Sequence, residues 1–244
     1  MTARRKLSVI ACPSLRPELE SLTDGCSNEI AFQHLEMALH ERSAAALHDA
    51  LQAAIDQTTD CDAIAIAYGL CNRGVVGVRA RNIPLVIPRA HDCIGILLGS
   101  SRRYLDVLEE EPGTFFQSAG WLNATRDERQ AEFHFGPNSN TSFALLAARY
   151  GDEAAQYLIE QLEGLTGHYK HLAYIATPVG ASPMYEAQAR AVAEARGLQY
   201  RRLDGDTGWL RRLLDGTWSS REFLVVQPGQ HIVLTSGDTL IEAA

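Results

Sequence analysis

Three of the five cysteines in this 244-residue chain lie just beyond short apolar runs that are typical of buried strands: Cys12, Cys71 and Cys93. Because the carboxyl ends of neighbouring parallel strands meet at one edge of a sheet, we expect these three thiols to lie close together. Helix N-termini at that edge carry partial positive charge, which favours thiolates over thiols. Sulfur ligands of this kind select zinc, copper(I) or an iron–sulfur cluster.

A set of three cysteine ligands leaves one coordination position of the metal open. In a [4Fe–4S] cluster held in this way, the fourth iron can bind a substrate, and a zinc ion with three protein ligands keeps a place for water or a substrate thiol. The closely spaced Cys-x-x-Cys pairs of structural zinc sites do not occur in the sequence. The pattern favours a catalytic [4Fe–4S] centre, with zinc as the alternative and a protein without metal as the third interpretation.

Each cysteine taken singly has a simpler interpretation, because a cysteine after a strand is most often a small buried hydrophobe. Cys61 precedes its predicted strand, so it belongs to the opposite edge of the sheet and is assigned to packing. Cys26 lies in a loop from which it could approach the site, although packing is the simpler interpretation there too.

Polar side chains accompany the cysteines at the same strand ends. We expect His91 to act as general acid or base, Arg89 to anchor a carboxylate or phosphate, and Tyr68 to donate a hydrogen bond to substrate or sulfur. Each residue also has an alternative role. His91 could ligate the metal or cap the following helix, Arg89 could pair with Asp92, and Tyr68 could simply fill the hydrophobic core. The turn over residues 72–74 offers backbone amides to an anion.

The elements that must position these residues alternate between strands and helices. Short apolar runs predict strands at Leu7–Ala11, Ala63–Ala67, Pro84–Ile87, Leu172–Ala176, Tyr200–Leu203 and Phe223–Val226. Helical patterns lie between them at about residues 41–57, 92–110, 141–163, 181–196 and 207–215. This order predicts an α/β fold with a doubly wound, mostly parallel sheet.

The whole chain, residues 1–244, is expected to form one α/β domain, which could contain two Rossmann-like three-stranded lobes over residues 1–140 and 141–244. The segment 111–140 interrupts the alternation with Pro-Gly and Gly-Pro-Asn turns. We expect loops or a lid there rather than core.

Composition excludes several classes of function. The net charge is −8 and no basic stripe with interleaved aromatics is present, so nucleic acid is not an expected partner. No stretch approaches the roughly 18 apolar residues of a membrane span, and the first apolar run is too short for a secretory signal. We therefore expect a cytoplasmic protein with reduced thiols and a small-molecule substrate. Neither a dinucleotide fingerprint nor a P-loop occurs.

Several unusual strings occur in one order along the chain: Tyr68-Gly69-Leu70-Cys71, Pro88-Arg89-Ala90-His91-Asp92-Cys93, Gly99 with Tyr104, and Gly113-Thr114 leading to Gly120-Trp121. Together they resemble the uncharacterised prokaryotic family of unknown function numbered 1638, over most of the chain. The family typically shows a further glycine directly after the Tyr-Gly-Leu-Cys string, whereas here Asn72 and Arg73 precede Gly74.

The resemblance implies a setting of anaerobic or one-carbon metabolism, sometimes beside corrinoid methyltransferase genes, and hence redox-sensitive metal chemistry or methyl transfer. A looser similarity of architecture links the pattern to three-cysteine enzymes such as quinolinate synthase and the desulfidases. The leading hypothesis is an open-site [4Fe–4S] enzyme of the lyase, desulfurase or hydrolase type, acting on a small polar or sulfur-containing molecule. The alternatives are a zinc-thiolate or corrinoid-linked methyltransferase and a non-enzymatic metal- or corrinoid-binding module, with a corrinoid protein or a second copy of the chain as partner.

Overall fold

The structure is a computed structural model, and it describes residues 4–40, 43–124, 147–148, 150–179, 182–236 and 239–244. Its larger sheet has five strands in the order β2-β1-β3-β4-β8. These are β1 (Lys6–Ala11), β2 (Glu29–His34), β3 (Ala63–Ala67), β4 (Leu85–Pro88) and β8 (Phe223–Val226). The first four in chain order run parallel to one another, and β8 pairs antiparallel with β4.

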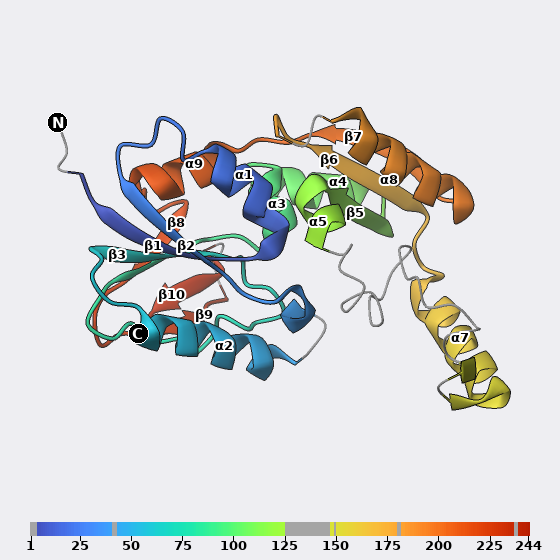
Figure 1. The fold of residues 1–244 in the computed structure, drawn as a ribbon, viewed down its shortest axis with the longest axis horizontal. Helices are drawn as coiled ribbons and strands as arrows, with labels where there is room; N and C mark the ends of the chain where they lie inside the picture. The colour runs from blue at the N-terminus through green and yellow to red at the C-terminus, as the bar shows by residue number, and fades with distance from the viewer. Residues whose placement is uncertain (1–3, 41–42, 125–146, 149, 180–181, 237–238) are drawn as a thin grey trace.

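A smaller sheet of three parallel strands, in the order β5-β6-β7, lies beside the first (Figure 1). Its strands are β5 (Thr114–Ser118), β6 (His171–Ala176) and β7 (Gln199–Asp204). A separate antiparallel pair is formed by β9 (Ile232–Leu234) and β10 (Ile241–Ala243). The mostly parallel α/β architecture predicted from the sequence is confirmed.

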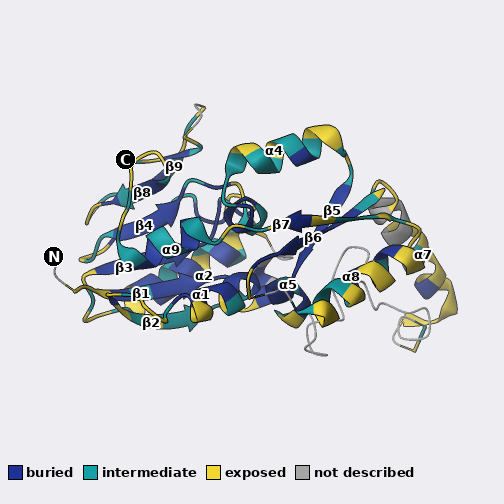
Figure 2. Cartoon of the chain, turned by 90° about the horizontal axis from the view of Figure 1, so that it is seen from above, coloured by how far each residue is buried: buried dark blue, intermediate teal, exposed yellow. Residues whose placement is uncertain are grey.

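Helices cover both faces of the larger sheet, with α2 on one face and α1 and α9 on the other (Figure 1). The helical elements are η1 (Pro13–Leu15), α1 (Arg16–Ser21), η2 (Met37–His40), α2 (Ala44–Gln57), α3 (Cys93–Leu97), α4 (Ser101–Glu110), α5 (Ala119–Ala124), α7 (Asp152–Thr166), α8 (Pro183–Ala195) and α9 (Gly208–Asp215). Packing on both faces explains why every residue of β3 is buried, as the continuous apolar run predicts. Buried residues run from this sheet into the smaller one (Figure 2).

Two predictions of local structure are corrected. The helical pattern at 92–110 forms two helices, because Gly99 adopts a left-handed φ of +72° between them, and a side chain there would meet Asp206 at 2.7 Å. Within the predicted lid, residues 114–124 instead form β5 and α5, with Phe116 buried in the core. Residues 125–140 of that segment lie outside the described residues, as do residues 141–146 and 149 of the predicted helix at 141–163.

The two sheets do not divide the chain at residue 140. The strand β5 comes from the first half of the sequence and joins the smaller sheet, while β8 comes from the second half and extends the larger one. The larger sheet therefore has five strands rather than three.

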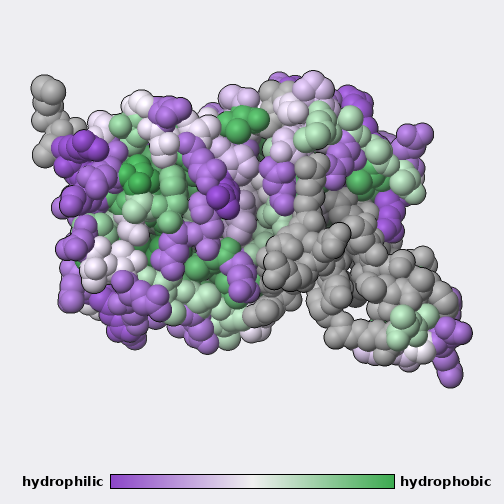
Figure 3. All heavy atoms as spheres, viewed as in Figure 1, coloured by the Kyte–Doolittle hydropathy of each residue, from purple (hydrophilic) through white to green (hydrophobic). Residues whose placement is uncertain are grey.

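The surface seen in Figure 3 is mixed: hydrophilic residues lie along the outer end of the larger sheet, and hydrophobic residues appear nearer its middle. None of the described helices combines the length and apolar character needed to cross a membrane.

Candidate three-cysteine site

The three predicted cysteines lie after strands that are immediate neighbours in the larger sheet. Cys12 directly follows β1, Cys71 follows β3, and Cys93 is the first residue of the helix after β4. Because these three strands run parallel, all three cysteines lie at the same carboxyl edge. Cys12 and Cys71 are buried and Cys93 is half-buried, and none of the three is in a disulfide.

The phenol of Tyr68 is a common neighbour of the three thiols. Its side chain is fully buried, and its hydroxyl donates to the carbonyl oxygen of Ala11 at 3.4 Å. Burial strongly raises the pKa of Tyr68, and the charges of Cys12, Cys71 and Cys93 each raise it further. Tyr68 therefore stays neutral, and all three thiols lie within electrostatic range of its buried hydroxyl.

Backbone contacts continue past the ends of the strands and fix the cysteine loops together. The amide of Cys71 donates to the carbonyl oxygen of His91 at 2.9 Å, and the amide of Cys12 donates to that of Ala67 at 3.3 Å. Gly69 permits this approach, because a Cβ atom there would lie 2.5 Å from the amide nitrogen of Asp92. Only glycine fits without moving one of the two loops.

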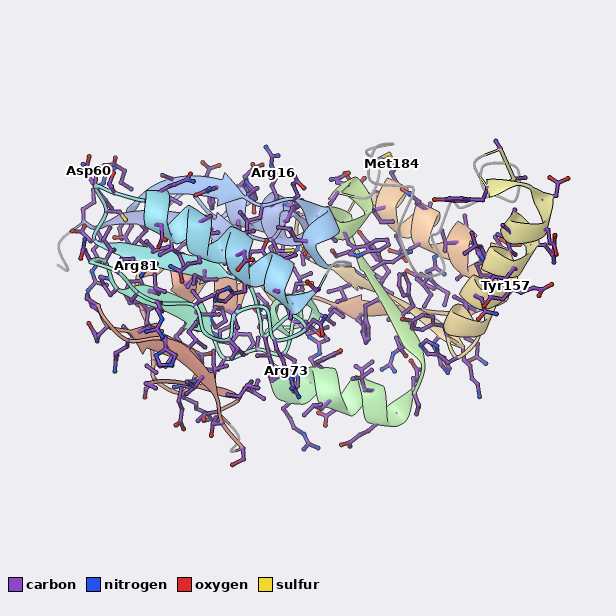
Figure 4. All side chains as sticks on the ribbon, turned by 90° about the horizontal axis from the view of Figure 1, so that it is seen from below. Arg16, Asp60, Arg73, Arg81, Tyr157 and Met184 are labelled. Carbon is purple, nitrogen blue, oxygen red and sulfur yellow. The ribbon has the colours of Figure 1, made fainter. Side chains whose placement is uncertain are left out.

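The turn that carries Cys71 has an unusual backbone. Cys71, Asn72 and Arg73 have φ angles of +40°, +55° and +66°. Left-handed backbone costs a non-glycine residue about 1–2 kcal/mol, so the turn stores strain of a kind that collects at functional sites. Asn72 and Arg73 are exposed, and Arg73 lies toward the smaller sheet, away from Asp60 at the other end of β3 (Figure 4). In the turn expected to hold an anion, the amide of Gly74 donates to the carbonyl oxygen of Cys71 at 3.1 Å.

Cys12 lies in a dry environment with one polar neighbour. Its Sγ atom is 2.9 Å from Oγ of Ser14, and both residues are fully buried.

Asp92 and Tyr104 support Cys93. One carboxylate oxygen of Asp92 caps α3 by accepting from the amides of Ile94 at 2.9 Å and Gly95 at 3.2 Å. Burial raises the pKa of Tyr104, and its hydrogen bond to Asp92 and the nearby Cys93 raise it further. The sequence assigned no role to Tyr104, which reaches the site from α4 through a tertiary contact.

The two charged residues predicted beside Cys93 occupy different settings. His91 is exposed at the edge of the site. The guanidinium of Arg89 donates to backbone carbonyl oxygens of Ser220 at 3.0 Å, Thr239 at 3.1 Å and Ile241. These hydrogen bonds link the end of β4 to the C-terminal segment. The role of Arg89 as a substrate anchor stays a prediction, because Arg89 would have to release some of these hydrogen bonds to bind a substrate.

His34 is a polar residue at the same edge that the sequence interpretation missed. It ends β2, opposite Ala11 in the register of the sheet. Its Nε2 atom is buried and has no hydrogen-bond partner among the described residues. Burial lowers the pKa of His34, and the charge of Arg16 lowers it further, so the neutral imidazole is favoured. The only signal in the sequence was its place at the end of an alternating run, Glu29–His34, that was not assigned to a strand.

The other two cysteines lie away from this edge. Cys61 precedes β3, as expected from the sequence. Cys26 precedes β2, and its thiol donates to the carbonyl oxygen of Leu214 at 3.6 Å.

The spacing of the donors limits which metal they would hold. Among the described residues, no three His, Cys, Asp or Glu side chains are grouped so as to hold a metal ion. A zinc ion needs its sulfurs about 2.3 Å away, whereas neighbouring strands lie about 4.8 Å apart, so β1 and β4 are about 10 Å apart. A cluster binds each thiolate to a different iron and spans a wider set of ligands. The absence of such a group in the described part of the chain applies to a cluster held by the same three cysteines as well as to a single ion.

Comparison with known proteins gives one match. A family model described as "Protein of unknown function (DUF1638)" matches residues 34–214, which include Cys71 and Cys93 and exclude Cys12. No curated protein matches, and no solved structure matches.

Proposed function

Since the chain belongs to the DUF1638 family of unknown function, we propose a function from the site alone: Cys12, Cys71 and Cys93 hold a [4Fe–4S] cluster with one open iron. At that iron a small polar or sulfur-containing molecule would undergo a lyase, desulfurase or hydrolase reaction. The cluster would supply a Lewis acid that polarises an oxygen or sulfur atom of the substrate.

The observation that carries this proposal is the placement of three thiols, after three adjacent parallel strands, at one sheet edge, each within electrostatic range of the buried Tyr68. Core packing alone does not require three cysteines at one sheet edge. Nor does it require a strained turn at Cys71 or a Ser14 hydroxyl beside the sulfur of Cys12. The coincidence of these features at one sheet edge favours a common ligand for the three sulfurs.

The surrounding residues would then have distinct tasks. Tyr68 would remain a neutral hydrogen-bond donor, and the Ser14 hydroxyl would help to position the sulfur of Cys12. Exposed His91 would move a proton at the solvent side of the site, as a general acid or base. Arg89 would anchor the substrate only if a substrate anion displaced its carbonyl partners.

The zinc-thiolate or corrinoid-linked methyltransferase remains the alternative among enzymes, and it requires the side chains to close in on one ion. A metal- or corrinoid-binding module is the alternative outside catalysis. Burial of Cys12 and Cys71 favours an enclosed reaction site over a carrier, which would have to present its cargo to a partner.

A pair of cysteine variants tests the metal centre. In full-length protein purified and reconstituted without oxygen, Cys71→Ala is expected to lose most of its iron and acid-labile sulfide. Cys61→Ala removes a thiol at the opposite edge of the same strand and should retain both. Equal iron in the two variants would contradict the proposal. Loss of bound zinc alone in Cys71→Ala would favour the methyltransferase alternative.

A His91→Ala variant separates the enzyme from the carrier. Because His91 is exposed and outside the thiol set, the variant should keep its iron content. In the enzyme, turnover of a substrate identified by screening small thiols and hydroxy acids should fall by roughly 10²-fold or more. Unchanged turnover would remove His91 from the mechanism.

A further inference from the structure

Glu18 is a buried carboxyl group that the three-cysteine site does not use. It lies on α1, its side chain has no exposed surface, and its Oε1 atom accepts from the Thr177 hydroxyl at 2.8 Å. Its Oε2 atom is also buried and has no hydrogen-bond partner among the described residues. Since Thr177 directly follows β6, this contact joins the segment after β1 of the larger sheet to the carboxyl edge of the smaller one.

The contact lies in a polar seam between the two sheets. Seven polar residues are buried in the described part of the chain, and five belong to the segments that meet here: Ser14, Glu18, Gln117, Ser118 and Thr177. The backbones are close as well, because a Cβ atom on Gly120 of α5 would lie 2.0 Å from the carbonyl oxygen of Ser14. Buried polar groups are costly unless their hydrogen bonds are kept, so the seam is sensitive to any new charge.

Glu18 has no cationic partner in the part of the chain that the structure describes. Within the described residues no lysine or arginine pairs with it, and Arg16 and Glu20 of the same helix pair with each other at 2.7 Å on the exposed side. From α9, Arg211 donates to the carbonyl oxygen of Leu22 at 2.7 Å. From β6, Tyr174 is within electrostatic range of Glu18: burial raises the pKa of Tyr174 to about 12, and the charge of Glu18 contributes to that rise.

A neutral carboxylic acid suits this position better than a carboxylate. Burial raises the pKa of Glu18, and the hydrogen bond from Thr177 only partly opposes that effect. The folded protein therefore binds the Glu18 proton more tightly than the unfolded chain does. The resulting stabilisation is complete below the unfolded pKa of a glutamate and is lost as the pH rises through the folded pKa.

We propose that Glu18 and Thr177 form a proton-dependent latch between the two sheets, closed while Glu18 carries its proton and loosened when Glu18 ionises. The latch holds the segment from Cys12 to Ser21 against the carboxyl edge of the smaller sheet. Its opening would free α1 from that edge and change the setting of Cys12, whether or not a metal is bound.

Hydrogen exchange of the full-length protein, compared with Glu18→Gln at each pH, tests the latch. The amide variant keeps an acceptor for Thr177 and cannot ionise. The measured quantity is the exchange rate of peptides covering α1 in wild type divided by the rate of the same peptides in Glu18→Gln. This ratio should be close to one at about pH 5 and should rise several-fold by about pH 9. Peptides from α2 provide the internal reference, and Glu20→Gln is the matched control on the exposed face of α1. A ratio that does not change with pH would overturn the proposal.

Urea denaturation gives a second readout. At the acidic end of the pH range, Glu18→Gln and wild type should unfold at the same midpoint concentration of urea. As the pH rises, the midpoint of Glu18→Gln should exceed that of wild type by an increasing amount. If Glu18→Gln does not fold, Thr177→Val is the second variant, expected to exchange rapidly at α1 throughout the range. Slow α1 exchange in Thr177→Val, matching acidic wild type, would also overturn the latch.

Discussion

The carboxyl edges of the two sheets differ in what they carry. At the larger sheet the strands β1, β3 and β4 are followed by three cysteines and a left-handed turn. At the smaller sheet β5 ends at Ser118, and β6 and β7 are followed by Thr177 and Gly205, all three of them small residues. A side chain on Gly205 would lie 3.1 Å from the carbonyl oxygen of Leu97. Similar parallel topology thus places thiols and a left-handed turn at one edge and small residues at the other.

The largest effect is expected where the two loops of the thiol edge touch. Gly69→Ala places a methyl group 2.5 Å from the backbone of Asp92, so we expect a loss of about 3 kcal/mol or more in the free energy of unfolding. Gly95→Ala is the matched control, because its nearest contact would be at 4.0 Å and alanine favours the helix by about 1 kcal/mol. Urea denaturation measures both, and equal stabilities would show that the loops are not in close contact.

An intermediate effect is expected from the cap that positions Cys93. Asp92→Ala should cost about 1–2 kcal/mol in unfolding free energy and lower the retention of iron, because α3 loses its cap and Tyr104 loses its acceptor. Ser43→Ala removes the comparable cap of α2, where Ser43 Oγ accepts from the amide of Ala46 at 3.3 Å. It should cost a similar amount of stability and leave iron unchanged. Iron loss in both variants would mean that global stability, and not the Cys93 loop, controls the metal.

The smallest effect tests the strained turn. Arg73→Gly relieves left-handed backbone strain of about 1–2 kcal/mol. The added conformational freedom of glycine in the unfolded chain offsets about 0.5–1 kcal/mol of this gain. A net gain of about 0.5–1 kcal/mol in unfolding free energy should therefore accompany weaker iron retention, as the Cys71 backbone is held less firmly. Asp60→Gly, with φ of +57° at the other end of β3, should gain stability and keep its iron. If Arg73→Gly retained iron as well as Asp60→Gly, the strain would have no role at the site.

Local patterns predicted the buried strands well and the half-exposed ones poorly. Ala63–Ala67 and Phe223–Val226 have the bounds expected from their apolar runs, because both strands are wholly or mostly buried and contain no polar residue. The edge strand β2 was missed since it carries Gln33 and His34 and is only partly buried. The strand β5 was missed because it follows directly on a Pro-Gly turn.

The candidate site was predicted only as far as topology determines it. The common edge of Cys12, Cys71 and Cys93 follows from the parallel order of three strands. The partners of Arg89 lie 131 and 150 residues away, and Thr177 lies 159 residues from Glu18. Contacts over such separations depend on how the two sheets pack, which no local periodicity encodes.

The most direct test of the central claim is an iron and acid-labile sulfide determination, with an absorption spectrum, on wild-type protein purified without oxygen. We expect about four irons and four sulfides per chain, as for a [4Fe–4S] cluster, together with visible absorption that Cys71→Ala lacks. Fresh anaerobic protein that holds neither iron nor sulfide, and takes up neither on reconstitution, would contradict it.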